Sequence, residues 1–142
     1  RAEAERWVET VPVPSPTIGT APPDRGLVGV ESWFWLRDGP IQPIVDRVSA
    51  FGIAVDVRIV ASPVVWDLGD GEPVTGGAGE AWPARSPIAR AYQHPGSRRI
   101  RATVQLEPAY RVGGSDWLPL PSITRTASVE HPVVAAQAII VG

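Results

Sequence analysis

The chain contains no cysteine, methionine, lysine or asparagine in its 142 residues. Without cysteine it cannot form a disulfide framework, a zinc–thiolate site, an iron–sulfur cluster or a cysteine nucleophile. It also has no apolar run as long as a membrane-spanning helix, so we expect no membrane span. The formal net charge is -2 and no nucleic-acid-binding motif occurs, so we expect no nucleic-acid partner.

All 13 basic residues are arginine, and alanine, glycine, proline and valine are common. This composition is typical of a GC-rich coding sequence and indicates a high-GC bacterium. The chain begins with Arg1, so we expect that an upstream segment, such as a signal peptide, has been removed. A secreted or cell-surface protein is the location that this predicts.

Glycine and proline are abundant, with 14 and 16 residues, which favours short strands joined by turns over long helices. Residues 1–9 are charged and are expected to form a turn of helix or no regular structure. Residues 11–23 carry five prolines and are expected to be extended, as polyproline or as an edge strand. We therefore predict a Pro-rich N-terminal lead-in over residues 1–23 and one β-domain over residues 24–142.

Alternating apolar residues separated by turn residues predict about eight strands and no clear helix. The expected strands cover residues 27–36, 44–50, 53–59, 64–66, 88–92 and 99–106, then the weaker 109–118 and 123–129, and a closing 133–141. Such regular spacing is typical of an antiparallel β-sandwich. The predicted fold class is all-β.

The run Trp66-Asp67-Leu68-Gly69-Asp70-Gly71, followed by Tyr92-Gln93-His94-Pro95-Gly96, resembles the PKD domain, an Ig-like β-sandwich of extracellular proteins. The sequence departs from the family pattern at Leu68, where Phe is usual, and at Arg98, where Tyr is usual. The resemblance implies a structural role for the shared motif residues Trp66, Asp67, Gly69, Asp70, Gly71, Tyr92, Pro95 and Gly96. PKD modules mostly act as spacers and binding units, so it implies no chemistry.

A narrower resemblance extends over Pro16 to Gly142, carried by Gly26-Leu27-Val28-Gly29-Val30 and Trp33-Phe34-Trp35-Leu36 together with the turn motif. In these residues the chain is similar to uncharacterised PKD-like secreted or membrane-anchored proteins of actinobacteria. Those relatives often carry a cysteine pair that residues 74–91 lack here.

Three carboxylates, Asp67, Asp70 and Glu72, lie within six residues. Calcium prefers several oxygen ligands from one loop, so these residues are a weak calcium candidate. The spacing does not match an EF-hand, and aspartates beside glycines commonly cap the N–H groups of a turn. We expect the structural role, and we expect no metal and no cofactor.

Catalytic constellations are missing from the sequence. The only histidines are His94 and His131, and no Gly-x-Ser-x-Gly elbow, His-Glu-x-x-His pair or P-loop occurs. We therefore expect a protein that is not an enzyme.

Residues 81–106 hold five arginines and no acid. Arg99 and Arg101 share one face of a predicted strand, where they would form a patch for an anionic polymer or an acidic partner. The alternative is an ordinary solvated face whose arginines pair with acids on neighbouring strands, such as Asp56.

The six tryptophans are many for this length. Trp66 is expected in the core, whereas Trp33 and Trp35 point to one face of their strand, opposite Phe34 and Leu36. Trp82 and Trp117 fall in loops. Exposed tryptophans at these four positions would bind a partner, or they would cover the open ends of a sandwich.

Two functions remain open from the sequence. The first is a non-catalytic surface or secreted module that contacts another protein, or a second copy of itself, through edge strands. In that case the Pro-rich segment 11–23 is a candidate to dock on such an edge. The second is a module that binds carbohydrate or cell-wall glycan through exposed tryptophans.

Overall fold

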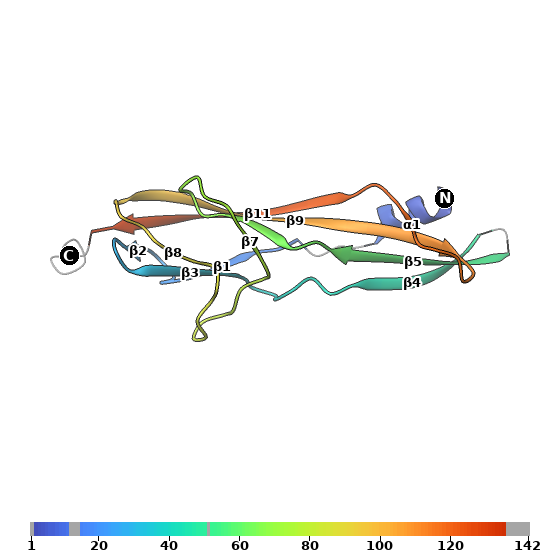
Figure 1. Ribbon diagram of the computed structural model, residues 1–142, viewed down its shortest axis with the longest axis horizontal. Helices are drawn as coiled ribbons and strands as arrows, with labels where there is room; N and C mark the ends of the chain where they lie inside the picture. Colours follow the sequence, from blue (N-terminus) through green and yellow to red (C-terminus); the bar gives the residue numbers. More distant parts are fainter. Residues whose placement is uncertain (1, 12–14, 51, 136–142) are drawn as a thin grey trace. The chain divides into compact units, whose positions relative to one another are not determined.

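The computed structural model describes residues 2–11, 15–50 and 52–135, and it confirms an all-β fold. The described part contains one helix and eleven strands (Figure 1). In chain order they are α1 (Ala2–Thr10), β1 (Ile18–Ala21), β2 (Gly26–Leu27), β3 (Glu31–Leu36), β4 (Ile44–Ala50), β5 (Ile53–Ala61), β6 (Val64–Asp67), β7 (Val74–Gly76), β8 (Ala89–Ala91), β9 (Gly96–Val112), β10 (Leu118–Pro119) and β11 (Ile123–Val134).

The chain divides into two compact units, each built from three segments. Unit 1 comprises Arg1–Pro14, Ile41–Ser62 and Val104–Arg125, and unit 2 comprises Ser15–Pro40, Pro63–Thr103 and Thr126–Gly142. The lead-in predicted over residues 1–23 contributes α1 to unit 1 and β1 to unit 2. No helix among the described residues is long and apolar enough to cross a membrane.

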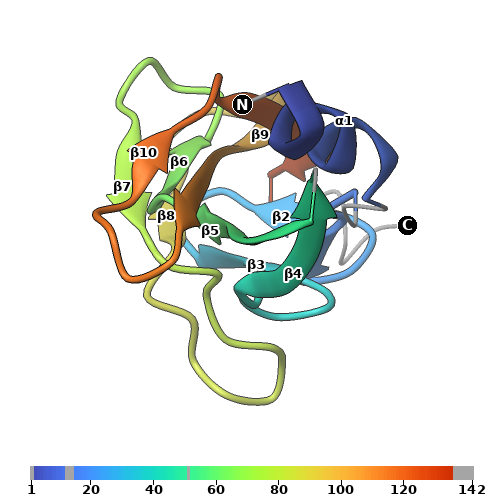
Figure 2. The same ribbon diagram turned by 90° about the vertical axis from the view of Figure 1, so that its right-hand side faces the viewer.

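Unit 1 is a sheet in which β5 lies between β4 and the C-terminal part of β9, all antiparallel. Helix α1 lies against this unit (Figure 2) because Ala4, Trp7 and Val8 recur at helical spacing and form its apolar side. Ala4 packs with Val55, and the full core cluster comprises Ala4, Val55, Val57 and Leu120, surrounded by Trp7, Val8, Val48 and Tyr110.

Unit 2 contains two sheets. The first is antiparallel, in the order β1-β3-β8. The second contains β2, β11, the N-terminal part of β9, β6 and β7, and its β2–β11 pair is parallel. The sheets meet where Phe34 of β3 packs edge-on against His131 of β11, with ring centroids 5.3 Å apart. Trp66 has no exposed surface, so its predicted place in the core is confirmed.

Most predicted strands are confirmed, and β4 has the predicted bounds. The predicted strand 27–36 is wrong in its extent, because residues 28–30 form a turn that separates β2 from β3. The predicted strands 99–106 and 109–118 are also wrong as separate elements, since β9 runs without a break from Gly96 to Val112. Of the closing strand predicted at 133–141, Val133 and Val134 belong to β11, and residues 136–141 lie outside the described part.

Helix α1 also differs from the prediction. The sequence predicted a turn of helix or no regular structure over residues 1–9, whereas the structure has a helix over Ala2–Thr10. Its C-terminus is held by two bonds to the Trp7 carbonyl, from the Thr10 hydroxyl at 2.9 Å and from the Val11 N–H at 3.0 Å. Trp7 also donates its indole N–H to Asp46 on β4. Long-range packing of this kind stabilises a short helix whose sequence alone is marginal.

A candidate binding groove lined by three tryptophans

The outer face of β1 and β3 in unit 2 forms the floor of a groove. Strand β3 alternates, so Phe34 faces the core while Trp33 and Trp35 face outward. Both tryptophans have a small residue opposite them on β1: Ala21 pairs with Trp33 and Gly19 pairs with Trp35. Because Gly19 has no side chain, the Trp35 indole lies over β1, whereas the Trp33 indole lies beside Glu31 on its own strand.

The Trp35 indole occupies the place of a side chain at position 19. A Cβ atom built on Gly19 would lie 2.3 Å from Trp35 Cε2, which is closer than any side chain tolerates. Gly19 is therefore required for this orientation of the indole. The close approach places Trp35 flat on β1 and fixes one end of the groove.

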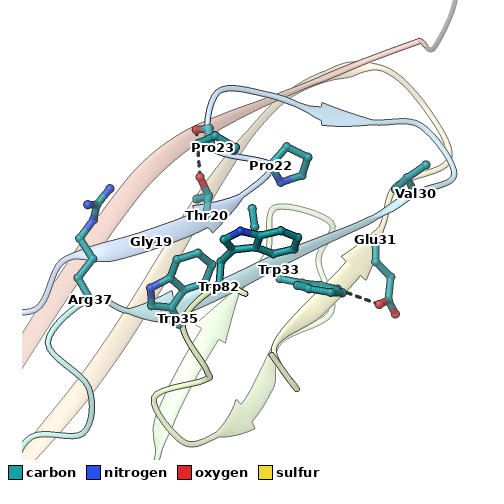
Figure 3. Close-up of a pocket in the computed structure, with 11 residues that line it drawn as sticks. Gly19, Thr20, Pro22, Pro23, Val30, Glu31, Trp33, Trp35, Arg37 and Trp82 are labelled. Carbon is teal, nitrogen blue, oxygen red and sulfur yellow. Dashed lines mark hydrogen bonds between the residues drawn. The ribbon is translucent and has the colours of Figure 1, made fainter. Parts of the chain in front are cut away.

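Trp82 and a pair of prolines complete the groove, whose volume is about 730 Å³ (Figure 3). The Trp82 ring lies 5.6 Å from the Trp33 ring, centroid to centroid, at an angle of 37°. Pro22 and Pro23 follow β1 and form another part of the wall, held by a hydrogen bond from the Thr20 hydroxyl to the Pro23 carbonyl at 3.2 Å. Trp82 is 62% exposed, so much of its ring is open to a ligand.

The loop that carries Trp82 is anchored to the back of the groove by Ser86, which is buried. Its hydroxyl donates to the Phe34 carbonyl at 2.6 Å and accepts from the N–H groups of Glu80 and Ile88. The N–H of Leu36 donates to the Ala78 carbonyl at 2.7 Å. Trp82 is thus presented by a loop with fixed ends, which reduces the ordering entropy that binding would cost.

Charged groups lie at both ends of the groove. Glu31 accepts hydrogen bonds from Trp33 Nε1 at 2.9 Å and from Arg85 Nη2 at 3.2 Å. The pKa of Glu31 is lowered from 4.5, first by the Trp33 hydrogen bond and then by Arg85. At the other end Arg37 donates from Nε to the Ile18 carbonyl and forms no ion pair with another described residue.

The groove is suited to binding through apolar contact. The carboxylate of Glu31 is already engaged by Trp33 and Arg85, and the remaining lining is mainly tryptophan, proline and small residues. The described residues contain no group of three His, Asp or Glu side chains able to hold a metal. One buried Ser–His pair exists, in which Ser32 Oγ and His131 Nε2 lie 2.8 Å apart, but both side chains are inside the core.

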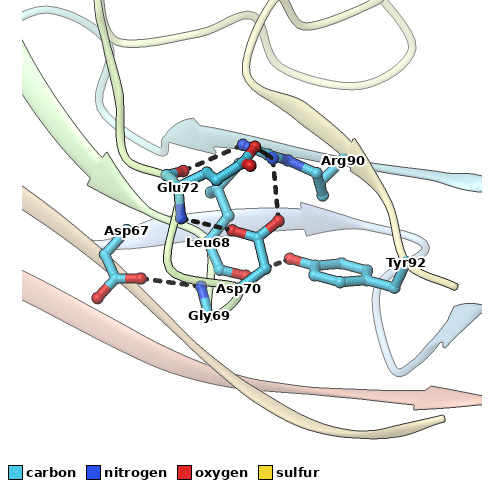
Figure 4. Close-up of polar contacts among 7 residues, drawn as sticks. All are labelled: Asp67, Leu68, Gly69, Asp70, Glu72, Arg90 and Tyr92. Atoms are coloured by element: carbon cyan, nitrogen blue, oxygen red, sulfur yellow. Dashed lines mark hydrogen bonds and ion pairs between the residues drawn. The ribbon is translucent and has the colours of Figure 1, made fainter. Parts of the chain in front are cut away.

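The predicted turn motif is held by its own carboxylates (Figure 4). Asp67 accepts from the Gly69 N–H at 2.9 Å, and Asp70 accepts from the Glu72 N–H at 3.2 Å. Arg90 then forms ion pairs with Asp70 at 2.9 Å and with Glu72 at 3.3 Å. The three carboxylates of the calcium candidate are therefore engaged in capping the turn and in neutralising Arg90.

Tyr92 links this turn to β8. Its hydroxyl donates to the Leu68 carbonyl at 2.6 Å, and burial, with the nearby charge of Asp70, raises the pKa of Tyr92 to about 12. Arg98, at the position where the PKD pattern has tyrosine, places its guanidinium 5.2 Å from the centre of the Tyr92 ring. It also donates to the His94 carbonyl, in the bend at Gln93 and His94 that precedes β9.

The four tryptophans proposed as binders do not form one site. Trp33, Trp35 and Trp82 line the groove of unit 2, whereas Trp117 belongs to unit 1. The guanidinium carbons of Arg58 and Arg111 lie over the Trp117 ring, 4.2 and 4.6 Å from its centre. Trp117 thus has arginine partners of its own.

Arg99 and Arg101 lie on β9, away from the groove lining. Arg99 forms an ion pair with Glu130 of β11 at 2.9 Å, and Arg101 is exposed. The acid suggested as a partner for these arginines, Asp56, instead pairs with Arg47 and Arg111.

Sequence reasoning did not assign the other residues that line the groove to a site: Gly19, Thr20, Ala21, Pro22, Pro23, Val30, Glu31 and Arg37. The small residues of β1 gave a signal, because a Gly or Ala opposite a tryptophan leaves room for the indole. That signal is readable only once the register of β1 on β3 is known.

Comparison of the chain with protein-family models, with curated proteins and with solved structures finds no match.

Proposed function

We propose that this chain is a non-catalytic β-module that contacts another protein in a bacterial surface or secreted assembly, and that the groove is its contact surface. The observation that carries the proposal is the convergence of Trp33, Trp35 and Trp82 on one open groove. Tryptophan is enriched among the residues that dominate binding energy at protein interfaces, because it buries a large rigid surface.

Two further observations support the proposal. The groove is built on strands, with Trp82 on an anchored loop, which gives a pre-organised surface. Its charged groups occupy the ends and its centre is apolar, the usual arrangement of an apolar contact core with a polar rim. The PKD resemblance and the extracellular location belong to the same proposal.

Site-specific cross-linking in the source cells tests this function. Trp82 is replaced by the photoreactive p-benzoylphenylalanine, and the matched control carries the same replacement at Trp117. We expect protein adducts after irradiation from position 82 and not from position 117. Equal adducts from both positions, or none from position 82, would contradict the proposal.

A second candidate function is glycan binding. It is favoured by the exposed ring of Trp82 beside Trp33, with Glu31 and Arg37 as polar groups at the ends, since ligand sites combine aromatic walls with a few polar side chains. Retention on insoluble cell-wall glycans measures it. Binding that is lost in Trp82→Ala and kept in Trp117→Ala would favour the glycan over the protein partner.

A further inference from the structure

We propose that the groove binds the segment Glu9–Pro16 of a second copy of this chain, in which Glu9 and Thr10 end α1 and Pro12, Pro14 and Pro16 follow, so that copies associate head to tail. This inference rests on the proposed function and names the partner. It joins two surfaces of the same chain: the three groove tryptophans, and a segment of alternating prolines with the sequence Glu-Thr-Val-Pro-Val-Pro-Ser-Pro.

Aromatic grooves bind proline-rich segments because proline fixes the backbone dihedral φ, so that little conformational entropy is lost on binding. In a chain with β-strand geometry, residues two apart face the same side and repeat every ~6–7 Å. Pro12, Pro14 and Pro16 have this two-residue spacing. Trp33 and Trp35 have the same spacing on the outward face of β3, so successive prolines match successive indoles.

Docking through prolines also fits the chemistry of the groove. The lining is mainly indole, pyrrolidine and small side chains, which favours ring-to-ring contact. A proline has no N–H to donate, so alternating prolines cannot complete a normal strand ladder with β1. The segment is thus expected to lie on the face of β1 and β3 and not along the edge of the sheet.

Charge complementarity selects the direction of the docked segment. Arg37 lies at one end of the groove beside Trp35, and Glu31 lies at the other end beside Trp33 (Figure 3). Arg37 has no ion-pair partner among the described residues, whereas Glu31 is paired with Arg85. The segment carries one acid, Glu9, which is exposed at the end of α1 and precedes the prolines. With Glu9 near Arg37, the docked segment runs antiparallel to β3.

A complementation experiment with the full chain tests the proposal directly. One variant, Trp82→Ala, loses part of the groove but keeps the segment. The other, Pro12→Ala/Pro14→Ala, loses the segment but keeps the groove. Sedimentation velocity over a concentration series is expected to show association of the unmodified chain, no association of either variant alone, and a heterodimer when the two are mixed. Trp82→Ala is expected to weaken association at least ~30-fold, as for a central interface tryptophan.

Two controls separate docking from a change in folding. Trp117→Ala and Pro119→Ala/Pro121→Ala alter the same residue types elsewhere and should leave association unchanged. The charge variant Arg37→Glu should weaken association about two- to fivefold, and Glu9→Arg in the partner copy should restore it.

A synthetic peptide with the sequence of residues 9–16 supplies an independent readout. It should change the tryptophan fluorescence of the unmodified chain and have a smaller effect on Trp82→Ala. The inference would be overturned if the unmodified chain stayed monomeric at its highest soluble concentration and its tryptophan fluorescence did not change with the peptide. It would also be overturned if a mixture of the two variants formed no heterodimer. If cross-linking from position 82 then captured a different protein, the proposed function would stand while this inference fell.

Discussion

The indole of Trp35 lies directly against the backbone of Gly19, its partner on the neighbouring strand. No β-carbon fits between them. The groove therefore requires glycine at position 19, because a side chain there would overlap the Trp35 indole. The backbone of Gly19 itself has an ordinary β-strand conformation.

Gly19→Ala should push the Trp35 indole off β1 and deform the groove. We expect a loss of about 1–3 kcal/mol in the free energy of unfolding, the usual cost of overpacking, together with a changed near-UV circular dichroism signal. Gly114→Ala is the control, because nothing lies within 4 Å of a Cβ at that position. An unchanged tryptophan signal in Gly19→Ala would show that the indole can move without consequence.

Tyr92→Phe should leave the buried Leu68 carbonyl without its hydrogen bond from the tyrosine hydroxyl. The expected cost is about 1–3 kcal/mol in urea unfolding, the desolvation penalty of an unsatisfied buried acceptor. Tyr110→Phe removes a hydroxyl for which no such contact is found in the described part of the chain, and it should cost less. Equal losses in the two variants would contradict a special role for the Tyr92 bond.

Stability should fall as the pH drops below about 6.5, the ordinary pKa of histidine. Burial lowers the pKa of His131 in the folded state, so in this range the unfolded chain binds the proton first. The free energy of unfolding is insensitive to this group above pH 6.5. It decreases by up to about 1.4 kcal/mol per pH unit as the pH falls from 6.5 toward the lowered folded-state pKa.

Urea unfolding midpoints measured between pH 8 and pH 5 test this prediction. The decrease in stability toward low pH should persist in the control His94→Gln, which changes an exposed histidine. It should disappear in His131→Gln, even if that variant is less stable at every pH. The carboxylates with lowered pKa, Glu31, Asp56 and Glu130, act in a separate window, because their contribution is lost only as the pH falls below about 4.5.

Calcium should leave the melting temperature unchanged. Arg90 forms ion pairs with Asp70 and Glu72, and one oxygen of Asp67 accepts from the Gly69 N–H, so a calcium ion would have to displace these contacts to gather the three carboxylates. Differential scanning calorimetry with millimolar calcium and with EGTA measures the effect. A melting temperature that rises with calcium and falls with EGTA would contradict this prediction and would support a calcium site at the turn.

Much of the fold was predictable because it rests on short-range patterns. Alternation placed β5, and the Asp-Gly pair placed the turn after β6, since both depend on residues close in sequence. The break between β2 and β3 was missed because residues 27–36 are mostly apolar and Gly29 alone marks the turn among them. Helix α1 was uncertain because its stability comes from packing on unit 1 and not from its own sequence.

The candidate site was only half predictable for the same reason. The alternation of β3 showed that Trp33 and Trp35 share a face, but not that Trp82, from a distant loop, stands beside them. Nor did it show that Trp117 belongs elsewhere, with Arg58 and Arg111. A sequence pattern shows which face of its strand a side chain occupies. Which residues lie beside that side chain depends on how distant segments of the chain pair in the fold.

Strand β3 serves two purposes with alternate residues: Ser32, Phe34 and Leu36 seal the interior, and Trp33 and Trp35 make the groove. A slip of one residue in its alignment with β1 would exchange these sets, exposing Phe34 and driving two indoles inward. Insertions or deletions within these six residues would thus abolish the groove and the core together. The lining of the groove can change by substitution at positions 33 and 35, but not by a change in strand length.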